Sequence, residues 1–297
     1  MNAAHLEIQG VNILQTESNA YHMEINSTIK TDGSIKANID AFEGEMYLED
    51  YEPHTAFATL LFPKTNANKH QVVNVSQEIK ITDMTAFTRF NVWFHNNETV
   101  RITINGRTKV KPHGLDRKYG VTFKKTLTIN GLNNFNGTEV TDGHISLEND
   151  DNGRNFNGTA NIPNNSVFTL DIVSCPRNND SCLIFCSPPL QGNVSFTNFV
   201  GDENVGTLYI QDLLLKPGDN VLNITATMDQ LAILSAVRKK PYCNTGILPF
   251  KLLGKSVVNN GDDLSYFAAA LASTNQTVNI DIGSIIKNDL GTTVKCA

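Results

Sequence analysis

The stretch Val100-Arg101-Ile102-Thr103-Ile104, followed by Asn105-Gly106, contains the pattern that decides the fold. Apolar residues alternate with polar ones, as in a β-strand with one buried face, and Asn-Gly is a strong signal for a hairpin turn. The same alternation occurs at 22–29, 71–81, 121–129, 167–173, 208–214 and 278–282. Further turn signals lie at Asp32-Gly33, Asn130-Gly131, Asn152-Gly153, Pro217-Gly218-Asp219 and Asn260-Gly261. The sequence therefore predicts an all-β fold of β-sandwich type, with a few short helices.

Three segments have helical spacing instead of alternation. Asp83 can cap a helix that continues to Phe94 and places Phe87, Phe90 and Phe94 on one face. Segment 227–238 has a similar stripe of Met228, Leu231, Ala232 and Val237, and segment 263–273 has one of Leu264, Phe267, Ala268 and Leu271. We interpret all three stripes as core packing rather than as ligand sites.

Strand, helix and strand follow one another twice along the chain. The first series is 72–81, 83–94 and 100–104, and the second is 208–225, 227–238 and 250–255. Two similar units account for the length of 297 residues, and a polar stretch from Asn133 to Asp142 separates them. We therefore expect one β-sandwich at 1–135 and a second, with a Cys-containing loop, at 136–297.

Composition restricts the class of partner. The chain has 24 basic and 30 acidic residues and a net charge of −6, which argues against a nucleic-acid binder. No apolar run approaches the ~18 residues of a membrane span, and runs such as Phe267 to Ala272 have the length of core segments. Residues Met1 to Gly10 lack the charged and apolar regions of a secretory signal.

Asparagine is abundant, with 36 residues, and ten of them lie in Asn-X-Ser/Thr sequons. Chance placement predicts about five sequons in this composition. The candidate glycan sites are Asn26, Asn74, Asn97, Asn136, Asn157, Asn164, Asn179, Asn193, Asn223 and Asn275. The sequons favour the secretory lumen, and an asparagine-rich composition is the alternative. We expect a membrane anchor upstream of Met1 to reconcile the sequons with the missing signal.

All five cysteines lie in the second half of the chain. The candidate disulfide residues are Cys175, Cys182, Cys186 and Cys243. We expect Cys175 to bridge Cys182 or Cys186, Cys243 to take the other, and Cys296 to stay unpaired, as suits an oxidising lumen. Free buried thiols are the alternative, and the CxxxC spacing disfavours a zinc site.

The second half contains several characteristic motifs, at Phe156 to Ser166 (FNGTANIPNNS), 205–208 (VGTL), 214–220 (LLKPGDN) and 229–230 (DQ). This run resembles the fungal domain of unknown function 3712 and its relatives, the type 2 late-embryogenesis-abundant (LEA-like) domains. The first half is similar more loosely, through 62–69 and 75–79. The resemblance implies tandem immunoglobulin-like β-sandwiches on the lumenal side of a single membrane anchor, as in some vacuolar-membrane proteins, and it implies no catalytic residues. The absent anchor and the insertion from Cys175 to Pro188 depart from it.

Local motifs for catalysis are absent from the sequence: it has no HExxH, Walker, GxSxG or GxGxxG pattern. The seven histidines are at least 16 residues apart, and we expect no catalytic, cofactor or metal site. The acidic clusters, 43–52 and 148–151, are interpreted as solvated loops, with weak calcium binding by Asp150 and Asp151 as the alternative.

One basic strip stands out, formed by Arg107, Lys109, Lys111, Arg117, Lys118, Lys124 and Lys125. It is a candidate contact for an anionic membrane surface, and lysines that protect an exposed strand edge are the alternative. We predict a non-enzymatic, glycosylated protein of the secretory lumen, at the vacuolar membrane or cell surface, that acts through protein partners. The alternative is a lipid-binding or lipid-transfer module with an apolar groove lined by Phe87, Phe90 and Phe94 or by Leu264, Phe267 and Leu271.

Overall fold

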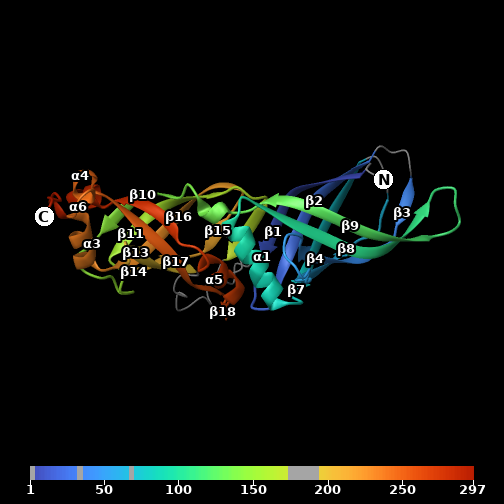
Figure 1. The fold of residues 1–297 in the computed structure, drawn as a ribbon, viewed down its shortest axis with the longest axis horizontal. Helices are drawn as coiled ribbons and strands as arrows, with labels where there is room; N and C mark the ends of the chain where they lie inside the picture. Colours follow the sequence, from blue (N-terminus) through green and yellow to red (C-terminus); the bar gives the residue numbers. More distant parts are fainter. Residues whose placement is uncertain (1–3, 32–35, 67–69, 173–193) are drawn as a thin grey trace, which may run out of the picture.

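The computed structural model describes residues 4–31, 36–66, 70–172 and 194–297. The molecule is elongated, with two lobes arranged end to end (Figure 1). The N-terminal lobe contains two facing sheets, and the C-terminal lobe is built on one large sheet. The prediction of an all-β fold with a few short helices is confirmed.

Two sheets, here called A and B, form the N-terminal lobe. Sheet A has the strand order β15-β12-β1-β2-β7, and sheet B has the order β5-β4-β8-β3-β6, with β9 on the other side of β8. The strands of sheet A are β1 (Ala4–Leu14), β2 (Ala20–Thr31), β7 (His70–Lys80), β12 (Phe168–Ile172) and β15 (Leu213–Leu215). Those of sheet B are β3 (Ala37–Ile39), β4 (Phe42–Leu48), β5 (Ala58–Phe62), β6 (Thr65–Asn66), β8 (Thr99–Pro112) and β9 (Tyr119–Asn130).

Sheet C forms the C-terminal lobe, with the order β10-β11-β16-β14-β13-β17-β18 and β19 also paired to β17. Its strands are β10 (Glu139–Ile145), β11 (Phe156–Asn164), β13 (Val194–Val200), β14 (Glu203–Ile210), β16 (Gly218–Met228), β17 (Ile247–Asn259), β18 (Asp262–Asp263) and β19 (Gln276–Asp281). Strands β10 and β19 approach each other, so the sheet curls around its own apolar interior.

Short helices cover the ends of these sheets. They are α1 (Met84–Asn96), η1 (Asn133–Phe135), α3 (Gln230–Val237), α4 (Tyr242–Thr245), α5 (Ser265–Leu271) and α6 (Ile282–Leu290). Helix α1 follows β7 and precedes β8, and α3 follows β16 and precedes β17, so the predicted order of elements is present in both halves. Asp83 caps α1 by accepting from the Ala86 N–H, and Asp229 caps α3 in the same way through Ala232.

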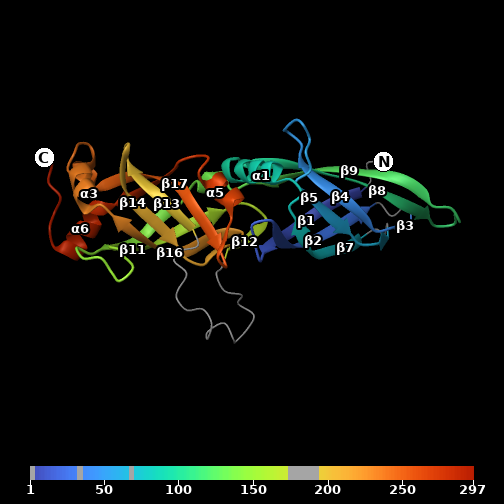
Figure 2. The ribbon, with the colours of Figure 1, turned by 90° about the horizontal axis from the view of Figure 1, so that it is seen from below.

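The two lobes share strands and a continuous core. Val11 to Ile13 of β1 pair in parallel with Phe168 to Leu170 of β12, which follows residue 135 in sequence. Helices α1 and α5 lie side by side at the junction (Figures 1 and 2). The Tyr266 hydroxyl donates to the Glu17 carbonyl at 3.1 Å, and Asn259 donates to the Thr16 carbonyl at 2.9 Å. The division at residue 135 stays a prediction, and the strand pairing crosses it.

Two local predictions were wrong. Asn105-Gly106 does not form a turn, because β8 continues through it and Gly106 pairs with Gly44 of β4. A Cβ at Gly106 would lie 2.3 Å from the Glu43 carbonyl oxygen, so glycine permits a close backbone approach there. The predicted strand 208–214 is broken at Asp212, whose φ is 51°, and its two parts join different sheets as β14 and β15.

Candidate functional site

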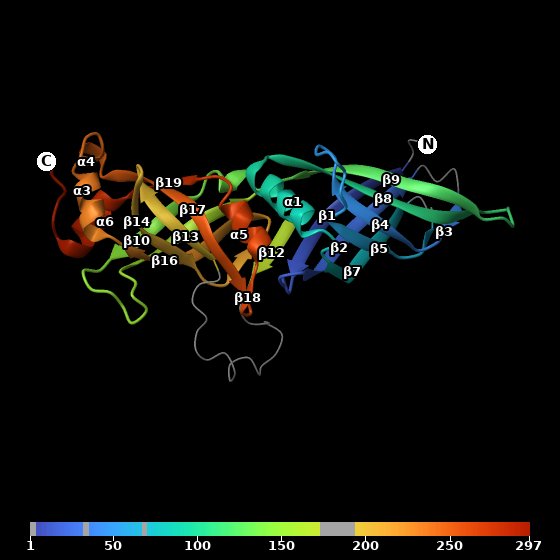
Figure 3. The ribbon, with the colours of Figure 1, turned by 60° about the horizontal axis from the view of Figure 1, so that its bottom comes forward.

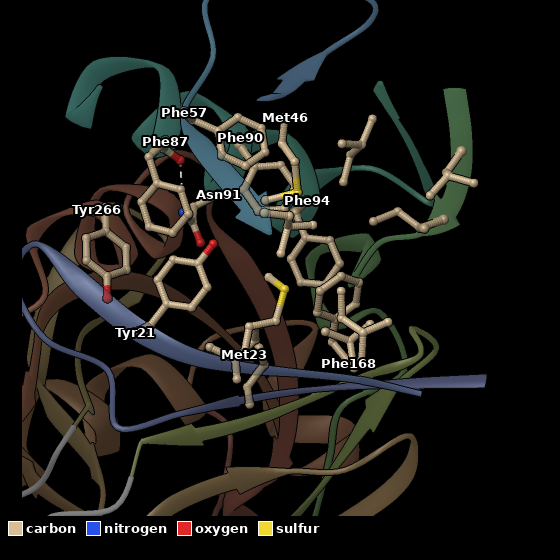
Figure 4. A pocket seen from close by; sticks show the side chains of 18 of the residues that line it. Tyr21, Met23, Met46, Phe57, Phe87, Phe90, Asn91, Phe94, Phe168 and Tyr266 are labelled. Atoms are coloured by element: carbon tan, nitrogen blue, oxygen red, sulfur yellow. Dashed lines mark hydrogen bonds between the residues drawn. The ribbon is translucent and has the colours of Figure 1, made fainter. Parts of the chain in front are cut away.

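An apolar cavity of about 90 Å³ lies between sheets A and B, beneath α1 and α5 (Figure 4). Its lining is almost wholly aliphatic and aromatic, and includes Phe87, Phe90 and Phe94 of α1. These rings belong to a stack: Phe57 lies 4.7 Å from Phe90, and Tyr266 of α5 meets Phe87 edge-on at 4.8 Å. The helical stripe read from the sequence therefore packs into the core of this lobe.

The few polar groups at this cavity are committed to other partners. Asn91 donates its side-chain N–H to the Phe87 carbonyl at 2.9 Å, one helical turn away. The Thr16 hydroxyl accepts from Asn259 at 2.9 Å. Burial raises the pKa of the Tyr21 phenol, and burial likewise raises the pKa of Tyr266. These groups stay neutral at physiological pH and do not offer acid–base chemistry.

The C-terminal lobe contains a second apolar cavity, of about 40 Å³. The alternative groove expected at Leu264, Phe267 and Leu271 is divided, because Phe267 lines the first cavity and Leu271 the second. Pockets for small molecules typically measure about 300–1,000 Å³. The two apolar cavities of the described residues are well below that size, so they do not form a lipid channel of the kind expected.

One side of the N-terminal lobe is left unpaired. Among the described strands, β9 pairs only with β8, and the ladder of β1 along Ala4–Gly10 is to β2, so no described ladder joins β9 to β1. We call the side of β9 that is turned away from β8 the seam. Three apolar side chains beside it are only partly buried against the core, namely Ile8, Phe123 and Leu127, and two of them, Ile8 and Leu127, also line the cavity. Burial of the core is therefore incomplete along the seam.

The basic strip lies on the β8–β9 hairpin, which projects beyond the other strands of the N-terminal lobe (Figure 3). The structure divides it between two faces. Arg107 and Lys109 share the outer face with Lys124, which is opposite Asn105, whereas Lys125 is opposite the buried Ile104. Lys111 and Arg117 belong to the same end of the hairpin, near the exposed Leu115 and Tyr119.

Acidic neighbours neutralise part of the strip. Lys118 bonds the Asp40 carboxylate at 2.6 Å, and this hydrogen bond lowers the pKa of Asp40. The pKa of Lys124 is raised, chiefly by its hydrogen bond to Tyr47 and also by Glu49. Arg107 and Lys109 line an open hollow of about 410 Å³ on the hairpin together with Asp40, whose pKa Lys109 also lowers. Because Asp40 is bonded to Lys118, Arg107 and Lys109 are the cations of the strip that we expect to meet an acidic partner.

Four sequon asparagines lie exposed on strands as two neighbouring pairs. Asn26 of β2 is opposite Asn74 of β7, and Asn157 of β11 is diagonal to Asn223 of β16, two residue pairs along the ladder and on the same face. The sequon residues Asn97, Asn136 and Asn275 are exposed as well. Asn179 and Asn193 lie outside the described residues.

Asn164 is buried, which argues against the prediction that it is a glycan site. Its side chain is 1% exposed, and its Nδ2 donates to the Phe168 carbonyl at 2.7 Å. Its Oδ1 accepts from the backbone N–H and the hydroxyl of Ser166. The amide therefore closes the turn between β11 and β12 and cannot carry a glycan in the folded protein.

The cysteine prediction was wrong in its pairing. Cys243 of α4 forms a disulfide with Cys296, with the Cα atoms 5.1 Å apart, so Cys296 is not unpaired and Cys243 does not bridge the earlier cysteines. The return of the C-terminal segment to α4 brings the two together, as the hydrogen bond from the Ala297 N–H to the Arg238 carbonyl indicates. Cys175, Cys182 and Cys186 lie outside the described residues. The disulfide fits a lumenal or extracellular domain.

The sequence reasoning missed one ionic contact between α6 and β10. His144 Nδ1 lies 3.1 Å from Asp289 Oδ1, and Asp289 Oδ2 accepts the Ile145 N–H at 2.8 Å. The hydrogen bond to Asp289 raises the pKa of His144, and the bond from Ile145 lowers the pKa of Asp289. The sequence signal that could have located α6, and with it this contact, is the helix start: the Asp281 side chain accepts the Ser284 N–H, and the apolar residues Ile285 and Ile286 follow.

Other titratable groups serve local structure. In the acidic clusters, Asp50 pairs with Arg101 at 2.6 Å, and Asp150 accepts from the backbone of its own turn. His95 is buried against Phe135, and burial lowers its pKa to about 4. No group of metal-ligating residues is found within the described ranges. No helix in these ranges is long and apolar enough to cross a bilayer.

Together these features describe an elongated all-β protein with a packed apolar interior, an unpaired edge at β9 among the described strands, and a basic hairpin. Residues 55–175 match the family described as "Protein of unknown function (DUF3712)", which supports the resemblance for that part of the chain. The match runs from β5 to just past β12 and so includes the 156–166 motif, crosses residue 135 and stops before the 214–220 motif.

Comparison with curated proteins gives no match. Among solved structures, the Salmonella enterica SafA pilin in complex with the SafB chaperone is similar at 10% identity and a TM-score of 0.20, with 94% of this chain and 96% of that chain covered. The CupB6 tip adhesin from Pseudomonas aeruginosa is similar at 7% identity and a TM-score of 0.22, with 93% and 96% covered. Scores this low carry no argument about function.

Proposed function

We propose that the chain is a non-enzymatic interaction module of the secretory lumen or cell surface, which binds an acidic protein partner through the β8–β9 hairpin. The observation that carries this proposal is the placement of Arg107 and Lys109 beside an open hollow of the β8–β9 hairpin. Cations presented together on a rigid hairpin favour association with a surface of opposite charge. The finer placement at the vacuolar membrane of a fungal cell, with an anchor upstream, belongs to the same proposal.

Support for an interaction role also comes from the interior. The cavities are apolar and small, and Asn91 and Tyr266 beside the first cavity are hydrogen-bonded to backbone carbonyls. The Cys243–Cys296 disulfide and the paired, exposed sequons suit an oxidising, glycosylating compartment. Glycosidase treatment of the protein from a eukaryotic source should lower its mass, and an unchanged mass would remove the lumenal part of the proposal.

The partner is tested by proximity labelling in the source cells. Arg107→Glu should remove acidic neighbours that the wild-type chain labels, because it reverses a charge at the proposed contact. Arg238→Glu is the matched control, since Arg238 is exposed in the C-terminal lobe, far from the hairpin. An identical set of neighbours for the wild type and Arg107→Glu would overturn the proposal.

A membrane surface is the second candidate, and a specific observation favours it. Leu115 and Tyr119 are 48% and 46% exposed at the end of the hairpin, among the basic residues. Apolar and basic groups together suit an anionic lipid surface. Flotation with vesicles containing or lacking phosphatidylserine separates the two candidates: binding that depends on the anionic lipid and on Leu115 would favour the membrane.

A further inference from the structure

The backbone of β9 has a free side whose direction can be assigned from the ladder. The Arg101 carbonyl accepts from Glu49 and the Lys109 carbonyl accepts from Asp40, so odd-numbered residues of β8 direct their backbone groups toward β4 and β3. Even-numbered residues of β8 therefore bond β9, where they are opposite odd-numbered residues. It follows that Gly120, Thr122, Lys124, Thr126 and Thr128 direct their N–H and C=O groups away from β8, into the seam.

Nothing among the described residues satisfies these outward groups. Other edges are protected: the Gln77 side chain bonds both the N–H and the carbonyl of Leu61 on β5, and Asp289 accepts the Ile145 N–H on β10. Strand β9 has 12 residues and no such cover. A long edge with a free ladder is a template for an added strand.

The side chains beside this edge specify what could be added. On the inner face, Phe123 packs on Phe42 and Phe62 but, like Leu127, is only partly buried, so apolar residues of an incoming strand would complete its cover. On the outer face, Lys124 of β9 would meet an acidic residue of the added strand, because directly opposed side chains on neighbouring strands lie about 5 Å apart. Arg107 lies one strand further away, opposite Thr122 of β9, and adds positive charge to the same face. A second copy of β9 fits poorly, since antiparallel self-pairing around Lys124 and Lys125 would place like charges together.

We propose that β9 accepts an extended acidic segment of a partner protein as an additional strand, with alternate apolar residues facing the seam. This deepens the proposed function, on which it rests, by defining how the acidic partner is held. The pairing would complete the burial of Ile8, Phe123 and Leu127 and join the hairpin to its partner through main-chain hydrogen bonds. The segment is recognised by its negative charge and by its alternation of acidic and apolar residues, rather than by one anchoring side chain.

The test uses the full chain and a capped, fluorescently labelled 11-residue peptide that alternates glutamate with valine. Fluorescence anisotropy should show binding that weakens with salt, and hydrogen exchange should show new protection at Lys124 and Thr126. Thr122→Pro removes one outward N–H without touching the β8 ladder and should weaken binding at least tenfold. Thr122→Ala, which keeps the N–H, should stay within twofold of the wild type.

A second reagent keeps the test independent of how well Thr122→Pro folds. The same peptide with alternate backbone nitrogens methylated keeps its charge but cannot form the ladder, and it should not bind the wild-type chain. Equal binding of the methylated and unmethylated peptides, no binding of either, or binding only to anionic vesicles would overturn strand addition. If strand addition fails while Arg107→Glu still removes the partner in cells, the proposed function stands and only its mode of contact is wrong.

Discussion

Removal of the Cys243–Cys296 disulfide should destabilise the C-terminal lobe strongly. The bond closes a loop with a sequence separation of 53, and that loop contains β17, α5, β19 and α6. The chain-entropy relation gives about 4 kcal/mol for a loop of this length. With a slope of about 2 kcal/mol per M urea, the unfolding midpoint should fall by about 2 M.

The variant is Cys243→Ser together with Cys296→Ser, so that no free thiol remains from this pair. Urea unfolding followed by circular dichroism measures the midpoint, and wild-type protein in a reducing agent should approach the variant. The fluorescence of Trp93, the single tryptophan, reports α1 at the junction of the lobes, next to α5. A midpoint change below about 0.5 M would refute the assignment of this stability to loop closure.

Further outcomes follow from single residues. Asn164 should stay unmodified in glycopeptide mass spectrometry although its sequon is intact, because its amide is buried and bonded; a glycan there would contradict the turn described. Gly106→Ala should cost about 2 kcal/mol or more in urea unfolding, since its Cβ would meet backbone at 2.3 Å, whereas Gly120→Ala, with open space, should be near neutral. The raised pKa of His144 means that its contact with Asp289 stabilises the fold at acidic pH and is lost as pH rises through that pKa, while the lowered pKa of Asp289 removes it in strong acid. His144→Gln should therefore lose more stability at pH 5.5 than at pH 8, and an equal loss at both would contradict the pair.

Local patterns predicted the elements that local physics controls. Asp83 followed by Phe87, Phe90 and Phe94 is enough to specify a capped helix with one buried face, and α1 has both properties. The strand at 121–129 was predicted because each apolar residue returns to the same face. The same reasoning applies to α6, where an Asp cap precedes a stripe of isoleucines. Strand β19 ends directly before this helix, so the change from alternating to helical spacing is difficult to recognise in the sequence.

The remaining features depend on contacts that are distant in sequence. The residues next to Gly106 in the sequence do not indicate that the Glu43 carbonyl will lie against it. In the sequence, a glycine that is required for close backbone approach is therefore indistinguishable from a glycine in a turn. Asn164 matches a sequon, and only its burial beneath β12 removes it from the glycan sites. The seam is the clearest case, because an unpaired edge is a property of the whole sheet and no single strand encodes it.

The junction of the lobes has a consequence for synthesis. Strand β1 gains its second neighbour in sheet A only when β12 has been made, and the hydrogen bond from Tyr266 to Glu17 spans 249 residues. At about 5–20 residues per second, the start of the chain waits roughly 12–50 s for the helix that covers it. Throughout that interval α1 can pack against Tyr21 and Phe57, but the face of Phe87 that meets Tyr266 lacks its cover. The N-terminal half is thus synthesised first but completes its packing last. The yield of folded protein should therefore depend on what protects this half while translation continues.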